Sequence, residues 1–168
     1  MKSSIKSKSL VLLILSTTIM FIAISANASS ISNNVSNAEH KQTIQQYINR
    51  IKTLQNQILY LNEYNLENSS ANKTDLSNRI TLVNNEIEEL RKEISSYIDA
   101  VPSISYQNRD VALAFSALTF IKNSLYQLTL LSEATSAVDR NLLLEDFYLL
   151  NRSATDTLNI LENLITRE

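Results

Sequence analysis

The residue types that most often do chemistry in proteins are scarce in this chain of 168 residues. His40 is its only histidine, whereas a two-metal site in a helical bundle needs several inward glutamates and more than one histidine. The segments 37–66 and 74–100, which have the clearest apolar patterns, carry no carboxylate at their inward positions. We therefore expect no metal centre and no cofactor, and we expect His40 to be a partly exposed, neutral side chain at a frayed helix end.

Nucleophilic catalysis needs a hydroxyl or thiol beside a base, and it usually needs a sharp glycine turn that exposes the nucleophile. The chain has no cysteine and no glycine. Four glutamates, at positions 86, 88, 89 and 93, are close enough in sequence to suggest the paired acids of a glycosidase, but their spacing places them on the solvent side of one helix. We predict no catalytic residue, and we predict that the chain is not an enzyme.

Leu59, Tyr60, Tyr64 and Leu66 are the residues that indicate recognition rather than catalysis. They fall outside the main apolar pattern of segment 37–66, and Tyr60 and Tyr64 are one helical turn apart. Exposed tyrosines beside leucines are typical of the centre of a protein–protein interface. The alternative, which we favour, is that these residues widen the buried face of the helix, because surface helices usually bury a broad stripe.

The elements that position these residues must be helical, because the chain has no glycine and its only proline is Pro102. Hairpins, tight turns between strands and helices, and loops that bind phosphate groups usually need glycine at positive φ. The composition, with 44% hydrophobic and 19% charged residues, is that of an ordinary globular protein that can bury a core. An all-α fold is therefore expected, and nucleotide sites of the glycine-rich kind are excluded.

The first 28 residues have the pattern of a signal peptide. Three lysines lie among the first eight residues, an uncharged and mostly apolar run follows at 10–24, and Ala26 and Ala28 are the small residues that signal peptidase recognises. Cleavage is expected after Ala28, which predicts an extracytoplasmic protein, either secreted or periplasmic. The alternative of an uncleaved anchor is disfavoured, because the run is shorter than the ~20 apolar residues that a membrane span needs.

Removal of this segment leaves 12 basic and 17 acidic residues, which is a formal charge of −5. A surface of that sign repels phosphate backbones and anionic lipids, so we expect no nucleic-acid partner and no stable membrane anchor once the signal is cleaved. Without cysteine the fold must be stable through packing alone. The expected partner is another protein or a second copy of the chain.

Local signals divide the rest of the chain into a disordered lead-in at 29–36 and four helices. Ser36 and Glu39 have the spacing of a capping box at the first helix start, and Pro102 must end the second helix. Apolar residues in these two helices recur at alternating spacings of three and four, which is the pattern of a packed seam. Between the third and fourth helices, only the cap residues and the low apolar content of 134–137 indicate a turn. The four helices are expected at about 37–66, 74–100, 105–134 and 138–166.

The third expected helix carries Lys122 as its only charge between Asp110 and Glu133. Its polar residues share one narrow face, so we interpret it as a helix buried on most of its circumference and not as a membrane span. Matched lengths and short connections predict an up-down-up-down four-helix bundle over residues 37–168, built from two long antiparallel hairpins. Two alternatives stay open: two separate hairpins, or a homodimer that joins the wide apolar faces of the last two helices.

These observations favour one class of function over another. The first hypothesis is an exported, non-enzymatic bundle that acts through protein–protein contacts, as a scaffold, an adaptor, a chaperone-like protein or a host-directed factor. The alternative is a membrane-active helical protein that inserts the hairpin of the third helix into a bilayer. Lys122, the polar face and the negative charge argue against this alternative.

Overall fold

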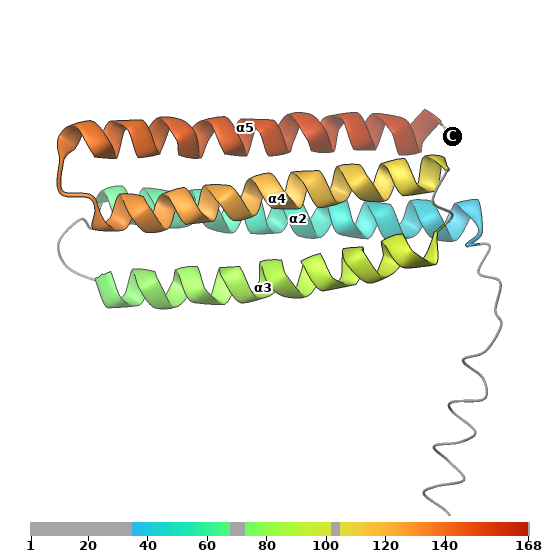
Figure 1. Cartoon of the computed structure of the whole chain (residues 1–168), viewed down its shortest axis with the longest axis horizontal. Coiled ribbons are helices and arrows are strands. Elements are labelled where there is room, and N and C mark those ends of the chain that lie inside the picture. The colour runs from blue at the N-terminus through green and yellow to red at the C-terminus, as the bar shows by residue number, and fades with distance from the viewer. Residues whose placement is uncertain (1–34, 68–72, 102–104, 168) are drawn as a thin grey trace, which may run out of the picture. The chain divides into compact units, whose positions relative to one another are not determined.

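The computed structural model describes residues 35–67, 73–101 and 105–167. The all-helical prediction is confirmed for these residues, and each helix begins and ends within one residue of its expected bounds. The predicted signal peptide, its cleavage site at Ala26 and Ala28, and most of the lead-in lie outside the described residues. The helices are α2 (Asn37–Glu67), α3 (Lys73–Ala100), α4 (Tyr106–Glu133) and α5 (Ala137–Arg167) (Figure 1).

Three of the four helices start at a serine that accepts a backbone N–H, as helix N-caps commonly do. At the start of α2 the capping box forms in both directions: the Ser36 amide donates to Glu39 Oε2 at 3.1 Å, and the Glu39 amide donates to Ser36 Oγ at 3.3 Å. Ser136 has the same role before α5, where its Oγ accepts from the Asp139 amide at 3.4 Å. Because Ala134 has an extended backbone, α4 and α5 are separated by a true turn without glycine or proline.

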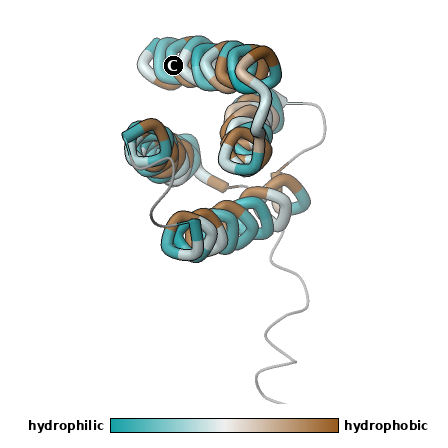
Figure 2. The backbone as a smooth tube through the Cα atoms, turned by 90° about the vertical axis from the view of Figure 1, so that its left-hand side faces the viewer, coloured by the Kyte–Doolittle hydropathy of each residue, from teal (hydrophilic) through white to brown (hydrophobic). Residues whose placement is uncertain are grey.

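Successive helices run in opposite directions (Figure 1). His40 near the start of α2 contacts Tyr97 near the end of α3, and Tyr64 near the end of α2 lies under Arg79 near the start of α3. α2 and α4 each contact the other three helices, and α4 is the central helix because its contacts are the most extensive. Among the described residues α3 and α5 make no contact, and Figure 2 shows them on opposite sides of the α2–α4 pair. The four helices therefore pack as a bundle.

The central position of α4 explains why its apolar face is wide. Its polar stripe points outward, with Ser116, Thr119 and Asn123 exposed. The side chain of Lys122 contacts α3, where its Nζ donates to Glu88 Oε1 at 2.5 Å. The search for membrane spans, made over the described residues, found no helix whose apolar stretch would reach across a bilayer.

α5 packs more closely on α4 than on α2. Ala154 on α5 is a small residue that is fully buried, and Ser124 on α4 is both small and buried, so the two backbones can approach closely. Asn151 crosses the contact and donates to Ser124 Oγ. The contact of α5 with α2 is largely polar, since Gln55 Nε2 donates to the Asn151 carbonyl at 2.8 Å and to Thr155 Oγ1 at 2.9 Å.

Candidate interaction surface

A shallow groove runs between α2 and α3, and it holds the most exposed of the residues that the sequence singled out. Tyr60 on α2 has 58% of its area exposed, and Leu82 on α3 has 62%. Both line the same groove, together with Arg79 and Glu86 as its charged residues. Tyrosine and arginine are side-chain types that are enriched in the core of protein–protein interfaces, and the exposed leucine adds apolar area beside them. The other lining residues are Gln57, Leu61 and Val83.

Arg79 is held in place at this groove by two neighbours. Its Nε donates to Asp75 Oδ2 at 2.8 Å, one turn earlier on α3. Its guanidinium carbon lies 5.6 Å from the centre of the Tyr64 ring, within the range of a cation–π contact. The hydrogen bond to Asp75 raises the pKa of Arg79 further above its already high usual value, so this side of the groove is permanently positive. Glu86 supplies the opposite charge.

The structure does not bring the four predicted interface residues together as one patch. Tyr60 and Leu66 are exposed, whereas Leu59 and Tyr64 are partly buried and pack against the core. Leu59 and Leu66 are seven residues apart and lie on the same face of α2 as Lys52, which forms an ion pair with α5. Tyr60 and Tyr64 lie on the side of α2 that meets α3. Two of the four thus widen the buried face, and Tyr60 alone reaches the groove.

Sequence reasoning missed Leu82, which forms the other side of this groove. The signal was present, because Leu82 falls next to Val83 of the α3 seam and so cannot share its inward face. A single leucine at an outward position is common on protein surfaces and attracts no attention by itself. Only the packing of α2 beside α3 places it across from Tyr60.

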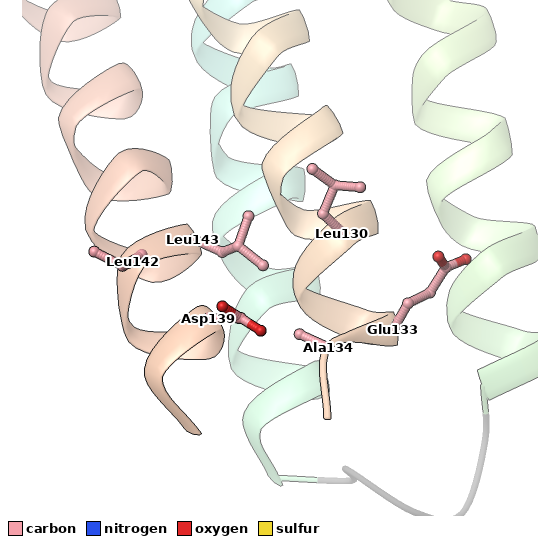
Figure 3. Close-up of a pocket in the computed structure, with 6 residues that line it drawn as sticks. All are labelled: Leu130, Glu133, Ala134, Asp139, Leu142 and Leu143. Atoms are coloured by element: carbon pink, nitrogen blue, oxygen red, sulfur yellow. The ribbon is translucent and has the colours of Figure 1, made fainter. Parts of the chain in front are cut away.

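A second hollow lies at the turn that joins α4 to α5 (Figure 3). Asp139 and Leu143 point toward α4 in this view, whereas Leu142 points away from it. Glu133 is the second acid of the lining. The two acids do not make a metal site: within the described residues, no three histidine, aspartate or glutamate side chains converge on one point.

The prediction that His40 is a partly exposed side chain is wrong, because its side chain has no exposed area. His40 Nδ1 lies 3.1 Å from the Tyr97 hydroxyl, and His40 Nε2 lies 3.5 Å from Asp110 Oδ2. The Tyr97 ring stacks on the imidazole at 5.9 Å, and the Tyr106 ring meets it edge-on at 6.1 Å. Side chains of α3 and α4 cover His40 at this end of α2.

Asp110 is the partner that sequence reasoning did not place. Its side chain is fully buried, and Arg109 Nη2 donates to its Oδ1 at 2.8 Å. His40 and Asp110 are 70 positions apart and come from different helices, so local patterns cannot pair them. Asp110 does precede the buried Ala114 and Ala117 by four and seven residues, which is a spacing that could have placed it on the core face.

The cluster around His40 joins α2, α3 and α4 at one end of the bundle, and the side chains of His40 and Asp110 at its centre have no exposed area. Burial raises the pKa of the Tyr97 hydroxyl on α3 and of the Tyr47 hydroxyl on α2, and the charge of Glu93 raises the pKa of Tyr47 further. The arrangement is a polar clamp that links three helices.

Comparison with known proteins assigns no family and no function to the chain. No family model, no curated protein and no solved structure matches the chain.

Proposed function

We propose that the chain is an exported, non-enzymatic helical bundle that acts through protein–protein contacts, as a scaffold, an adaptor, a chaperone-like protein or a host-directed factor. The observation that carries the proposal is the α2–α3 groove, where Tyr60 and Leu82 stay exposed beside a fixed arginine. Burial of two large apolar side chains against a partner is favourable by roughly 1.5–3 kcal/mol for each side chain. Arg79 and Glu86 can set the orientation of that partner through charge.

Export is the second part of this proposal and rests on the first 28 residues. The three early lysines, the apolar run at 10–24 and the small residues Ala26 and Ala28 support a cleaved signal peptide. Mass spectrometry of the protein recovered from the culture medium or the periplasm tests it directly. The expected N-terminus is Ser29, and a chain that still begins at Met1 would contradict cleavage.

The partner proposal is tested by affinity recovery from the compartment into which the protein is exported. The test variant carries Tyr60→Ser and Leu82→Ser, which remove the two exposed side chains of the groove. The matched control is Tyr126→Ser, because Tyr126 is 61% exposed but lies on α4 and does not line the groove. We expect a specific protein to be recovered by the native chain and the control but not by the double variant.

Two outcomes would contradict the proposal. In one, the double variant recovers the same protein as the native chain. In the other, no protein is recovered and the pure chain turns over a substrate. Leakage of liposomes at low protein concentration would favour the membrane-active alternative instead, in which α4 would have to leave its position between three other helices.

A further inference from the structure

Two hollows follow each other along the outside of the contact between α2 and α3. One is the α2–α3 groove, where Tyr60 and Leu82 are exposed on opposite walls. The other is lined by Arg50, Thr53, Leu54, Glu86 and Glu89. Because Glu86 lines both hollows, they form one continuous depression, which we call the extended α2–α3 groove. It is apolar at the end with Tyr60 and Leu82 and acidic at the end with Glu86 and Glu89.

Helical spacing sets the distance between the apolar end and the acids. Leu82, Glu86 and Glu89 are exposed and follow one another at intervals of four and three positions, so they form a row along one side of α3. At 1.5 Å per residue, this row spans roughly 10 Å from the leucine to the second acid. Tyr60 on α2 faces the start of the row. A partner can therefore meet an apolar pair and two acids within two helical turns.

The arginines of the extended groove are already compensated by acids of the same chain. Arg79 Nε donates to Asp75 Oδ2 at 2.8 Å, one turn earlier on α3. Arg50 on α2 forms an ion pair with Glu93 on α3 across the contact of the two helices. Neither arginine is therefore left to neutralise the other acids of the groove.

Glu86 and Glu89 are the charges that remain without compensation. Among the residues that the structure describes, neither of them takes part in an ion pair. Lys92 follows Glu89 by three positions, but it lines neither hollow. Glu67, which is exposed seven positions after Tyr60 on the same side of α2, adds a further acid at the apolar end. The charge of the extended groove is thus negative, and it fits a basic partner.

A second copy of the chain does not supply that basic charge. Of the twelve basic residues beyond position 28, seven already form ion pairs. The other five are Lys41, Lys73, Lys92, Arg140 and Arg167. No two of these five lie within two turns of each other on any described helix. A different protein is therefore the better match for two neighbouring acids.

We propose that the extended α2–α3 groove binds a basic amphipathic helix of another protein. A large apolar side chain of that helix packs between Tyr60 and Leu82, and lysines or arginines four and seven positions away pair with Glu86 and Glu89. Amphipathic helices bind in this way to the apolar grooves of other proteins. The inference rests on the proposed function, because it names the chemistry of the partner for the same groove.

Two synthetic peptides of ~20 residues, long enough to form a helix, test the charge of the occupant. Both carry leucines along one helical face, and the positions four and seven residues from these leucines are lysine in one peptide and glutamate in the other. In a fluorescence titration, we expect the native chain to bind the lysine peptide at least about tenfold more tightly than the glutamate peptide. Equal binding of the two peptides, tighter binding of the glutamate peptide, or binding of neither would overturn the inference.

Charge variants test whether the two acids hold the lysine peptide. The double variant Glu86→Gln and Glu89→Gln should weaken its binding about fivefold, because two partly exposed ion pairs are lost. The matched control is Glu145→Gln with Asp146→Asn, which removes two exposed acids of α5. Loss of the same size in the control would show a general effect of net charge and would overturn the site. An unchanged affinity in the first double variant would overturn it as well.

The apolar contact is tested with the same peptide. Tyr60→Ser with Leu82→Ser should weaken binding of the lysine peptide about tenfold or more, whereas Tyr126→Ser on α4 should leave it unchanged. Circular dichroism of each variant shows whether it keeps the native helicity. In NMR spectra of the native chain, amide shifts on addition of the peptide should concentrate around Tyr60, Leu82 and Glu86. Shifts confined to α5 would overturn the proposed surface.

Failure of this inference and failure of the proposed function can be told apart. A foreign protein that is recovered through Tyr60 and Leu82, but binds equally well without the charges of Glu86 and Glu89, would overturn the basic helix and leave the proposed function standing. A native chain that sediments as a dimer and dissociates in the Glu86→Gln, Glu89→Gln variant would make a second copy the occupant and overturn the inference. A chain that binds neither peptide and recovers no foreign protein would contradict both proposals.

Discussion

The buried pair of His40 and Asp110 allows a quantitative test of the clamp between α2 and α4. Both side chains have no exposed area, and His40 Nε2 lies 3.5 Å from Asp110 Oδ2. Removing the partner of a buried polar group typically costs about 1–3 kcal/mol, and more where a charged group is involved, because the remaining group stays out of water without its partner. We expect Asp110→Leu to lower the free energy of unfolding by about 3 kcal/mol, or the melting temperature by about 10 °C.

His40→Leu should lower the free energy of unfolding by less, about 2 kcal/mol, because Asp110 keeps its contact with Arg109. The Arg109 side chain is itself partly exposed to water. When both residues are replaced by leucine, no buried polar partner is left behind on either helix. The double variant should therefore be more stable than the sum of the two single losses predicts, by about 1–2 kcal/mol. The surplus measures the coupling between the two side chains.

The assay is urea unfolding followed by circular dichroism, with all variants measured at the same pH and protein concentration. Asp99→Leu is the matched control, because Asp99 is an exposed aspartate at the same end of the bundle and its loss should change the stability by less than ~0.5 kcal/mol. Additive single losses would show that the two side chains do not interact. An Asp110→Leu chain as stable as the control would show that the clamp contributes nothing.

Three further predictions concern the core and the titration of the bundle. Burial raises the pKa of Tyr97 and Tyr47 above the usual value of 10.0, so the stability that these two hydroxyls contribute is fully present below pH 10 and should be lost as the pH rises through the raised values. The Tyr97→Phe variant should begin to unfold at a higher pH than the native chain. The same pH of unfolding in both chains would show that ionisation of Tyr97 does not cause the alkaline loss of stability. The hydrogen bond from Lys122, and to a smaller extent the one from Arg91, lower the pKa of Glu88 below 4.5. The stability that these contacts contribute is therefore present above pH 4.5 and should be lost as the pH falls through the lowered pKa. In Glu88→Gln, the free energy of unfolding should fall less steeply as the pH is lowered below 4.5. An equally steep fall in this variant would show that Glu88 does not contribute to the acid dependence. Ile87→Asp places a carboxylate at a fully buried position and should cost several kcal/mol or abolish folding, whereas unchanged helicity and melting temperature would show that α3 is not packed there.

Local chemistry determined where the helices of this protein begin and end. The capping box of Ser36, the stop before Pro102 and the apolar seams of α2 and α3 depend only on neighbours in sequence. Such signals are readable because capping and side-chain periodicity act over one or two turns. The absence of glycine and the four separate seams were enough to predict an all-helical bundle. Export stays a prediction from the first 28 residues.

The tertiary structure decided which faces meet. Helical periodicity shows that a residue faces inward, but it does not show which helix lies opposite or how far that neighbour extends. The burial of His40 depends on Asp110, 70 positions away on α4, and on the rings of Tyr97 and Tyr106. The division between Tyr60 and Tyr64, two tyrosines of one helix, depends on where α3 crosses beside them. The exposure of Leu142, Leu149 and Ile160 on α5 likewise follows from the place of this helix beside α4 and away from α3, because burial is a property of the packed neighbours and not of the residue alone.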